Sequence, residues 1–225
     1  MINHALIMAA GRGLRMRPFT DSAPKAMAPW RDTTLIARGI EMVHRRVPNV
    51  HVTVGYRGAM LAEHVIQHGA STVLNTEGRG NSWWLYNTFL SLVDEPVLVL
   101  TCDNVVELDF DAIEADYRER GRPACMLVPV PPVPGIEGDY IDETNHIVRR
   151  LSRSLESALY CSGIQIVNPV KIRYLTTPVQ DFSALWNQLI PFGQVRTSRV
   201  YEQEWFSVDT FEQLVRMGHA QASPD

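Results

Sequence analysis

The sequence predicts an α/β fold in which a mostly parallel β-sheet carries helices on both faces. The length of 225 residues, with 45% hydrophobic and 20% charged content, is enough for one sizeable buried core. Short apolar runs typical of buried strands alternate with segments of helical periodicity, which is the pattern of parallel α/β sheets. A glycine-rich segment directly follows the first apolar run, at the expected turn from strand to helix.

From the N-terminus to Val130, predicted strands and helices alternate along the chain. The predicted helix over 35–47 has apolar residues at Ile36, Ile40 and Val43, which lie on one helical face. The predicted strands cover residues 5–10, 50–54, 71–74, 96–101 and 124–130. The predicted helices cover residues 35–47, 59–68, 82–93 and 110–120.

After Val130 the pattern becomes less regular. The Pro/Gly-rich segment 129–139 leads into YIDETNHIV, which predicts a hairpin around residues 143–145. Further strands are predicted at 159–167 and 194–200, and further helices at 182–190 and 210–218, with Thr210 as the N-cap of the last. Because no linker, repeat or low-complexity tract interrupts the chain, residues 1–225 are predicted to form one domain.

Composition and charge exclude several classes of protein. The formal net charge of −4 and the pI near 6.0 give no electrostatic sign of a nucleic-acid partner. Three separated cysteines without a CxxC pair indicate neither a disulfide framework nor a zinc knuckle. No apolar run approaches the ~18 residues of a membrane span, and the first residues lack the basic region of a signal peptide. We therefore expect a cytoplasmic protein without a membrane partner.

The segment 11–27, GRGLRMRPFTDSAPKAM, is the most informative stretch of the chain. Glycines after a β-strand allow backbone N–H groups to approach a phosphate or a base closely. The loop is not a dinucleotide-binding loop, because Met16 stands at the third glycine position and Gly55 follows the second strand in place of an acidic residue. It is not a Walker A loop either, since Gly-Lys-Ser/Thr is absent.

The same loop is strongly basic. It carries Arg12, Arg15 and Arg17, and after two prolines it ends on Lys25. Only Lys25 and Lys171 are lysines among the 21 basic residues, so Lys25 differs from the arginine that this chain otherwise uses. A stiffened cationic loop at the carboxyl end of a strand suits the phosphates of a nucleoside triphosphate. The alternative is a solvated loop whose arginines only keep the protein soluble.

This loop resembles the signature of the nucleotidyltransferases that make NDP-sugars and CDP-alcohols, G-x-G-x-R-[LM]-x-P-x-T-x-x-x-P-K-x-[ML]. Its fixed positions are all met, by Gly11, Gly13, Arg15, Met16, Pro18, Thr20, Pro24, Lys25 and Met27. The resemblance implies a Rossmann-like, nucleotide-diphospho-sugar transferase or GT-A-like fold. It also implies that Ala9, Ala10, Gly11 and Gly13 hold the nucleotide, and that Arg15 and Lys25 are catalytic residues that neutralise its phosphates.

Two aspartates are candidate ligands of Mg²⁺. Nucleotidyl transfer brings two polyanions together, and Mg²⁺ is usually held by one or two carboxylates and the substrate phosphates. Asp103 directly follows the strand at 96–101 and matches the family's acidic position there. Asp209, in EWFSVDTFEQL, resembles the family position that supplies a second metal ligand. The alternative to metal binding is a structural role for each residue, in which Asp103 forms a turn and Asp209 starts the last helix.

The segment 75–92, NTEGRGNSWWLYNTFLSL, resembles the choline-phosphate cytidylyltransferase branch of the family and its phosphonate relatives. The resemblance implies nucleotide contacts for Asn81 and Ser82. Trp83, beside Trp84, is expected to contact the acceptor as part of a cation–π pocket for an ammonium group. The alternative is that one ring packs in the core and the other caps a cleft. Tyr56 either borders the nucleotide or packs within its loop.

The C-terminal half instead resembles the sugar-1-phosphate branch. There the hairpin and the following Ser-Gly-Ile strand frame the acceptor, which implies acceptor contacts for Ser162 and Gly163. The family lysine that grips the acceptor phosphate has no counterpart in VRRLSRS. Arg150 or Arg153 would replace it, and we expect Arg153 in this role.

These motifs together predict a Mg²⁺-dependent nucleotidyltransferase that couples an NTP to a sugar-1-phosphate or a similar small phosphomonoester and releases pyrophosphate. Residues 1–130 would form the nucleotide-binding half and residues 131–225 the acceptor-binding half. A cytidylyltransferase for phosphocholine or a phosphonate is the alternative within the family. A glycosyltransferase would need a DxD pair, which the sequence after Cys102 lacks, and a non-catalytic nucleotide sensor would not need both aspartates. The nucleobase, the acceptor and the formation of homo-oligomers stay open.

Overall fold

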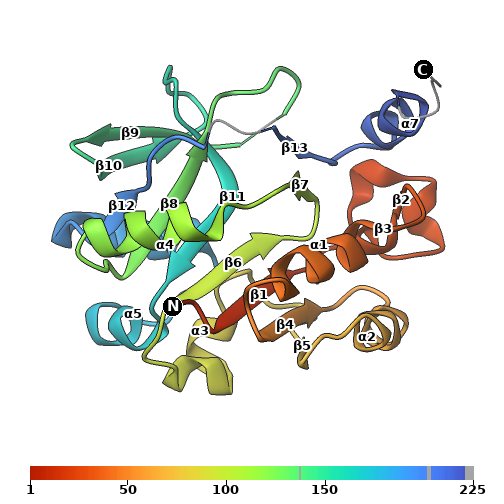
Figure 1. Ribbon diagram of the computed structural model, residues 1–225, viewed down its shortest axis with the longest axis horizontal. Coiled ribbons are helices and arrows are strands. Elements are labelled where there is room, and N and C mark those ends of the chain that lie inside the picture. The colour runs from red at the N-terminus through yellow and green to blue at the C-terminus, as the bar shows by residue number, and fades with distance from the viewer. Residues whose placement is uncertain (137, 202–203, 221–225) are drawn as a thin grey trace.

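A nine-stranded sheet runs through the computed structural model, which describes residues 1–136, 138–201 and 204–220 (Figure 1). The order of strands in the sheet is β5-β4-β1-β6-β11-β8-β12-β10-β9. Four strands from the first half of the chain form its parallel part, namely β1 (His4–Met8), β4 (Asn49–Val54), β5 (Thr72–Asn75) and β6 (Val97–Thr101). The rest of the sheet combines β8 (Cys125–Val130), β9 (Tyr140–Thr144), β10 (Ile147–Ser152), β11 (Tyr160–Val167) and β12 (Val195–Thr197).

Strand β11 changes the direction of the sheet. It lies between β6 and β8 and is antiparallel to both, whereas β12 is parallel to β8. Strands β9 and β10 form the predicted hairpin at the edge of the sheet. The mixed α/β class with a large parallel core sheet is thus confirmed, and within this sheet every antiparallel pairing includes a strand from residues 131–225.

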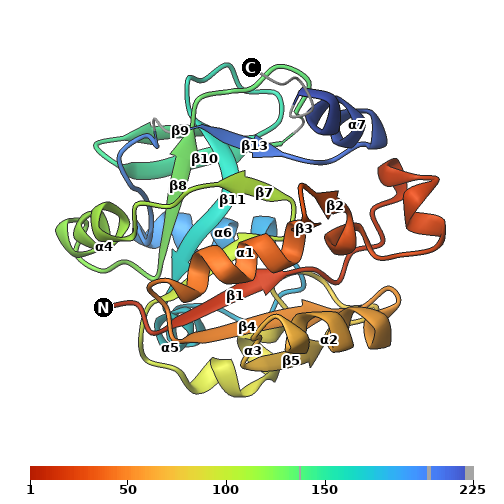
Figure 2. The same ribbon diagram turned by 45° about the vertical axis from the view of Figure 1, so that its right-hand side comes forward.

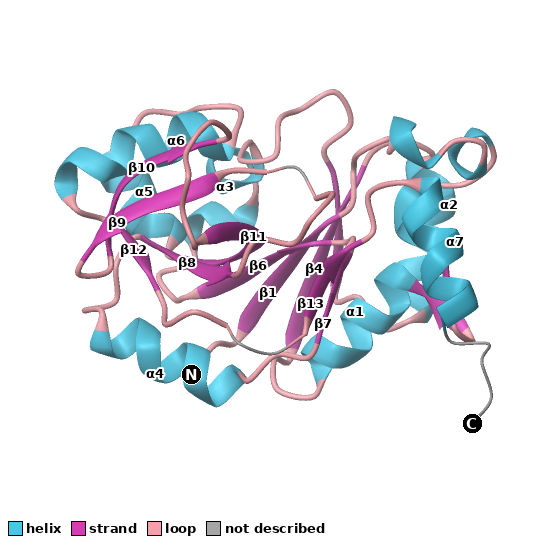
Figure 3. Ribbon diagram, turned by 90° about the horizontal axis from the view of Figure 1, so that it is seen from above, coloured by secondary structure: helices cyan, strands magenta, loops and turns pink. Residues whose placement is uncertain are grey.

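Helices cover both faces of the sheet, as Figure 3 shows from above. One face packs against α1 (Leu35–His44), α2 (Gly58–Gln67) and α4 (Phe110–Glu119). The other face packs against α3 (Trp84–Asn87), α5 (Pro169–Leu175) and α6 (Phe182–Leu189). Successive strand side chains point to opposite faces, so Ala5 and Ile7 join the first core cluster and Leu6 joins the second.

Two small ribbons extend beyond the sheet. Strands β2 (Pro29–Trp30) and β3 (Thr33–Thr34) form one, and β7 (Asn104–Val106) pairs with β13 (Trp205–Ser207) in the other. The second ribbon brings the C-terminal segment back to the end of β6, and α7 (Phe211–Ala220) then lies beside the β2–β3 region (Figures 1 and 2). A third core cluster joins these parts, with Met16 and Trp30 packed near Val208.

Most predicted elements are confirmed within one to three residues at each end, but the helix predicted over 82–93 is wrong. That segment forms the short α3 and then a 3₁₀-helix, η4 (Phe89–Leu92). Thr88 separates them in an extended conformation, with φ −124° and ψ 172°, and its hydroxyl donates to the carbonyl of Trp84. A Thr side chain that bonds the backbone in this way competes with helix continuation.

Two further differences lie in the second half. The strand predicted over 194–200 ends at Thr197, because the backbone N–H and guanidinium of Arg199 turn to bind the carboxylate of Asp116. The sequence analysis did not include α5, although Asn168 caps it and Pro169 begins it. The cap predicted at Thr210 is confirmed, since its hydroxyl accepts from the N–H of Gln213 and the Gln213 amide accepts in return.

No helix in the described part of the chain is long and apolar enough to cross a membrane.

Candidate active site

The loop after β1 folds into three 3₁₀ turns, η1 (Leu14–Met16), η2 (Phe19–Asp21) and η3 (Lys25–Met27). Gly13 has φ +68°, and a Cβ atom there would lie 2.6 Å from the Cβ of Lys25. The hydroxyl of Thr20 donates to the carbonyl of Gly13 at 3.0 Å. Gly13 therefore allows the two ends of the loop to pack in contact, and this packing sets the position of Lys25.

Lys25 joins the two predicted metal-binding aspartates. Its Nζ lies 2.5 Å from Oδ2 of Asp103 and 2.9 Å from Oδ1 of Asp209. The three side chains are only 12%, 16% and 14% exposed. Burial by itself would lower the pKa of Lys25, but the charges of Asp103 and Asp209 outweigh it and raise the pKa above its ordinary value. Lys25 is thus a cation held between two anions.

The aspartates reach this cluster from distant parts of the chain. Asp103 follows β6, and the N–H of Val208 donates to its carbonyl at 3.1 Å through the β7–β13 ribbon. That contact brings Asp209 to the same end of the sheet, where Nη2 of Arg15 lies 3.2 Å from its Oδ1. The predicted residues Arg15, Lys25, Asp103 and Asp209 therefore form one cluster at the carboxyl ends of β1 and β6.

The carboxylates fit a divalent cation. Oδ1 of Asp103 is buried and has no hydrogen-bond partner among the described residues. Those residues contain no group of three or more His, Cys, Asp or Glu side chains that could hold a metal ion alone. Mg²⁺ commonly takes one or two carboxylates and completes its octahedron with water and phosphate oxygens. The pair Asp103 and Asp209 suits an ion bound together with phosphate.

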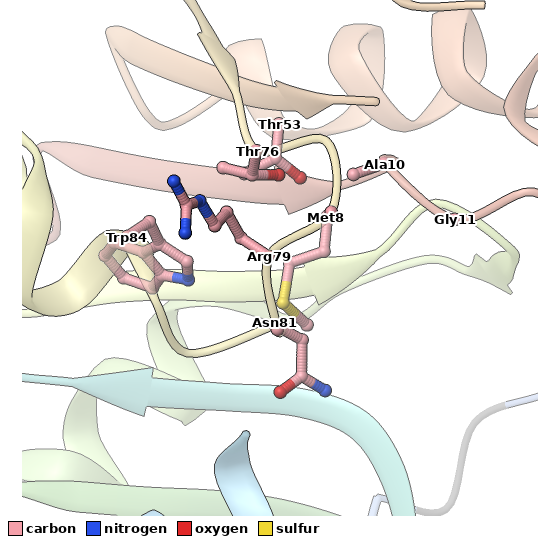
Figure 4. A pocket seen from close by; sticks show the side chains of 10 residues that line it. Met8, Ala10, Gly11, Thr53, Thr76, Arg79, Asn81 and Trp84 are labelled. Atoms are coloured by element: carbon pink, nitrogen blue, oxygen red, sulfur yellow. The ribbon is translucent and has the colours of Figure 1, made fainter. Parts of the chain in front are cut away.

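A cavity of about 220 Å³ lies on the other side of the glycine loop, between the ends of β1, β4 and β5 (Figure 4). Of the predicted nucleotide-binding residues, Ala10, Gly11 and Asn81 line it. A Cβ atom at Gly11 would meet nothing within 4 Å, so its backbone borders open space. Its remaining lining residues are Met8, Thr53, Thr76, Gly78, Arg79, Gly80 and Trp84.

A clamp fixes the loop that carries Asn81. We use this name for the contacts between residues 80–82 and residues 179–182. Gln180 accepts from the N–H groups of Gly80 and Ser82, and Val179 accepts from the Ser82 hydroxyl at 3.1 Å. The N–H of Phe182 donates to Oδ1 of Asn81 at 2.9 Å. Ser82 is fully buried, and its hydroxyl serves this clamp.

Two other predicted nucleotide-binding residues support the loop from behind. The hydroxyl of Tyr56 donates to the carbonyl of Thr20 at 2.8 Å, and the guanidinium of Arg12 lies 5.0 Å from the centre of the Tyr56 ring. The N–H of Ala9 donates to Oγ1 of Thr53 at 3.1 Å. Tyr56 and Ala9 thereby hold the loop in position, and neither lines the cavity.

A second cavity, of about 380 Å³, is lined by Ile136, Gly138, Tyr140 and Arg153. Tyr140 and Tyr160 form an edge-to-face pair with ring centres 5.5 Å apart. Burial, and then the charge of Asp209, raise the pKa of Tyr160 to about 12. Arg153 thus shares its cavity with Tyr140, whose partner Tyr160 lies within reach of the charge of Asp209.

The other predicted acceptor residues lie elsewhere. Trp83 is half-buried, and the guanidinium of Arg79 lies over its ring, 5.4 Å from the ring centre. Ser162 is buried, and its hydroxyl donates to the carbonyl of Val128. Gly163, at φ +79°, approaches Thr101 so closely that a Cβ atom would lie 2.9 Å from its hydroxyl oxygen. These three residues do not line the cavity that contains Arg153.

Sequence reasoning missed several cavity residues, namely Met8, Thr53, Thr76, Arg79, Ile136 and Tyr140. Met8 and Thr53 end parallel strands, and Thr76 follows another, where open α/β sheets bind ligands. The strand ends were therefore a usable signal. For Trp84 the sequence left a pocket and the core open, and the structure packs its ring in the core at the wall of the cavity.

The comparisons with known proteins agree with this geometry. Residues 5–165 match the family model described as MobA-like NTP transferase domain. The mannose-1-phosphate guanyltransferase of Neurospora crassa is 24% identical over 200 residues, which is 80% of this chain and 55% of that protein. The chain spans about half the length of the curated guanyltransferases that it matches.

Solved structures share the fold. A structure from Bacillus anthracis, described as a glucose-1-phosphate thymidylyltransferase, has a TM-score of 0.80 at 13% identity and covers 99% of this chain and 96% of its own. The CTP:phosphocholine cytidylyltransferase of Streptococcus pneumoniae has a TM-score of 0.76 at 16% identity, with 98% and 100% covered. At this identity the likeness concerns the fold alone.

Proposed function

Because the chain belongs to the family of MobA-like NTP transferase domains, we propose that it is a nucleotidyltransferase that uses Mg²⁺ to couple an NTP to a sugar-1-phosphate or a similar small phosphomonoester. Membership confirms the family resemblance that the loop 11–27 indicates. The observation that carries the proposal is the contact of Lys25 with both Asp103 and Asp209. The glycine loop that leads to Lys25 also borders, at Gly11, a cavity large enough for an organic group.

In the proposed reaction, an oxygen of the acceptor phosphate attacks the α-phosphorus of the NTP. The new P–O bond forms as the bond to the bridging oxygen breaks, and pyrophosphate leaves with that electron pair. Lys25 and Arg15 bind the triphosphate and stabilise the charge that develops on the leaving group. Asp103 and Asp209 would hold a divalent cation, which would supply further positive charge to the phosphate oxygens.

The two halves of the chain divide the substrates in this proposal. Residues 1–130 bind the nucleotide through the glycine loop and the cavity that contains Asn81. Residues 131–225 bind the acceptor through the cavity that contains Arg153, whose guanidinium meets the acceptor phosphate. In this proposal the phosphates of the two substrates meet at Lys25, Asp103 and Asp209.

The geometry favours a sugar phosphate over a phosphocholine acceptor. An ammonium group would need a free aromatic face, but the guanidinium of Arg79 already lies over the ring of Trp83. We place the reaction in the cytoplasm, because Cys102, Cys125 and Cys161 are all free thiols.

Pyrophosphate release with Mg²⁺ tests the proposal, across four NTPs crossed with hexose-1-phosphates, phosphocholine and aminoethylphosphonate. We expect release with one NTP and a sugar-1-phosphate, and only when both are present. Release with phosphocholine or the phosphonate alone would support the alternative acceptor. NTP binding without release in any combination would favour a nucleotide sensor, and the absence of NTP binding would contradict the whole proposal.

A further inference from the structure

The indole N–H of Trp84 is a hydrogen-bond donor without a partner among the described residues, at the cavity of about 220 Å³ that Gly11 also lines. The residue is 1% exposed and belongs to the second core cluster, with Leu6 and Leu90. Its indole N–H is buried and has no partner among the described residues, although the side chain lines the cavity. A buried N–H without a partner costs about 1–3 kcal/mol, so such a group is expected to have a ligand or water partner in the working protein.

Figure 4 shows the indole nitrogen directed toward the space between Met8, Arg79 and Asn81. The cavity of about 220 Å³ exceeds the ~30 Å³ that one water molecule takes in the liquid, so it has room for an organic group. Trp84 cannot turn away from this space easily, because its ring is enclosed in the core. The donor is therefore preorganised toward whatever fills the cavity.

The neighbouring side chains also present donors. Asn81 also lines the cavity, and the N–H of Phe182 donates to its Oδ1, which fixes that amide. Oγ1 of Thr53 accepts from the N–H of Ala9, so the hydroxyl proton of Thr53 is available. Arg79 adds a guanidinium, which has donors only. A ligand edge that meets these side chains must carry acceptors.

We propose that the indole N–H of Trp84 donates to a ring carbonyl oxygen of the nucleobase and selects bases that have one. This inference rests on the proposed function, since it assumes that the cavity receives the base of an NTP. Cytosine, uracil, thymine and guanine carry a ring carbonyl. Adenine carries none, and where guanine has its carbonyl adenine has an amino group, which cannot accept from the indole N–H. Trp84 is thus a specificity-determining residue, and ATP is the NTP that the protein discriminates against.

The first test is NMR of the indole N–H groups in the full-length protein. The chain has five tryptophans, and Trp84→Phe identifies the signal of Trp84 by its loss. We expect that signal to move downfield when the preferred NTP saturates the protein, as a new hydrogen bond requires, and to move little with ATP. If Trp84→Phe does not fold, Trp→Phe changes at the other four positions assign the signal by elimination. An unchanged Trp84 signal at saturation would overturn the proposal.

The second test measures how the protein discriminates between NTPs. We expect Trp84→Phe to lower the ratio of kcat/KM for the best NTP to that for ATP by about tenfold or more, because a site that hydrogen-bonds its ligand rejects one that leaves a buried polar group unpaired. Trp186→Phe is the matched control. Trp186 is a buried tryptophan of the same core cluster, but its N–H already donates to Gln165, and it lies outside the cavity. Its substitution should leave the ratio unchanged.

The outcomes separate this inference from the proposed function. Turnover by the parent protein, combined with an unchanged ratio in Trp84→Phe, overturns the role of Trp84 and leaves the function standing. A parent protein that prefers ATP also overturns the role. A parent protein that binds no NTP at all contradicts both proposals.

Discussion

At the scale of single residues, the candidate site depends on a few charges held where burial makes them costly. Lys25 is buried, yet it keeps its proton because Asp103 and Asp209 lie 2.5 and 2.9 Å from its Nζ. In the free protein this lysine balances both carboxylates. The proposed reaction would use the same charge on phosphate oxygens.

Replacing Lys25 with alanine should therefore remove most of the activity. We expect Lys25→Ala to cost about 2–4 kcal/mol of transition-state stabilisation in kcat/KM, comparable to the loss of one preorganised donor. The same change at Lys171, the only other lysine, is the control. Its Nζ donates to the carbonyl of Arg122, which is not part of the cluster formed by Arg15, Lys25, Asp103 and Asp209. Turnover of Lys25→Ala within threefold of the parent would show that Lys25 does not have the assigned role.

A second residue makes stability depend on pH. His51 is buried on β4, where its ring contacts Thr72 and stacks on His4. Burial, and then the charge of His4, lower the pKa of His51 from 6.5 to about 4. Above pH 6.5, the pKa of His51 in the unfolded chain, the residue is neutral in both states and the stability is fully present. As the pH falls toward 4, the unfolded chain takes up a proton that the folded chain cannot, so the free energy of unfolding decreases.

We expect the free energy of unfolding to fall by about 1–2 kcal/mol between pH 7 and pH 5 on account of this residue. Denaturant titrations at the two pH values measure the difference. His51→Val, which removes the titrating group from the strand, should reduce it by that amount. An equal pH dependence in both proteins would exclude His51 as the cause.

At the scale of elements, the clamp between residues 80–82 and 179–182 shapes the nucleotide cavity. Its two segments are about one hundred positions apart, and they meet so closely that a Cβ atom at Gly80 would lie 1.9 Å from the carbonyl oxygen of Gln180. The same contact fixes the amide of Asn81. The cavity wall that belongs to the first half of the chain therefore depends on backbone from the second.

Gly80→Ala should accordingly destabilise the fold. The added methyl group meets backbone that cannot move aside cheaply, and overpacking of this kind costs about 1–3 kcal/mol. Gly11→Ala is a matched comparison, because its Cβ atom meets nothing within 4 Å and its φ is not positive. We expect it to leave the melting temperature unchanged while it weakens NTP binding, since the methyl group projects at the cavity. Equal melting temperatures for both variants would contradict the role of the clamp.

At the scale of the whole molecule, the fold completes the site by returning its C-terminal segment to its beginning. The β7–β13 ribbon brings Asp209 to Asp103, and Val208 joins the core cluster of Met16 beneath the glycine loop. The free protein holds these parts together with its own ion pairs. We therefore expect this architecture to hold without a bound cation.

Removal of divalent cations should separate activity from stability. With EDTA we expect pyrophosphate release to stop and to return on addition of Mg²⁺, while the melting temperature changes by no more than about 2 °C, because Lys25 neutralises the carboxylates in the absence of the ion. Parallel activity assays and thermal melts measure both. A large drop in melting temperature would mean that the ion is structural, and full activity in EDTA would exclude a metal from the reaction.

Much of this protein could be predicted from its sequence, because the relevant signals are local. The strands up to Val130 and the hairpin at 140–148 show in the spacing of apolar residues, which records burial on one face of an element. The glycine loop, Lys25 and the carboxylates of Asp103 and Asp209 show in motifs within short segments. These residues do meet in one cluster.

Only the tertiary structure decided the rest, because a local pattern records that a residue is buried but not which distant residue it meets. Strand β11 is antiparallel between two strands of the first half, which its apolar sequence alone could not indicate. The hydroxyl of Ser82 is committed to Val179, and the orientation of Asn81 depends on Phe182. Trp84, for which the sequence left a pocket and the core open, is buried in the core and has its unpaired N–H at the wall of the cavity.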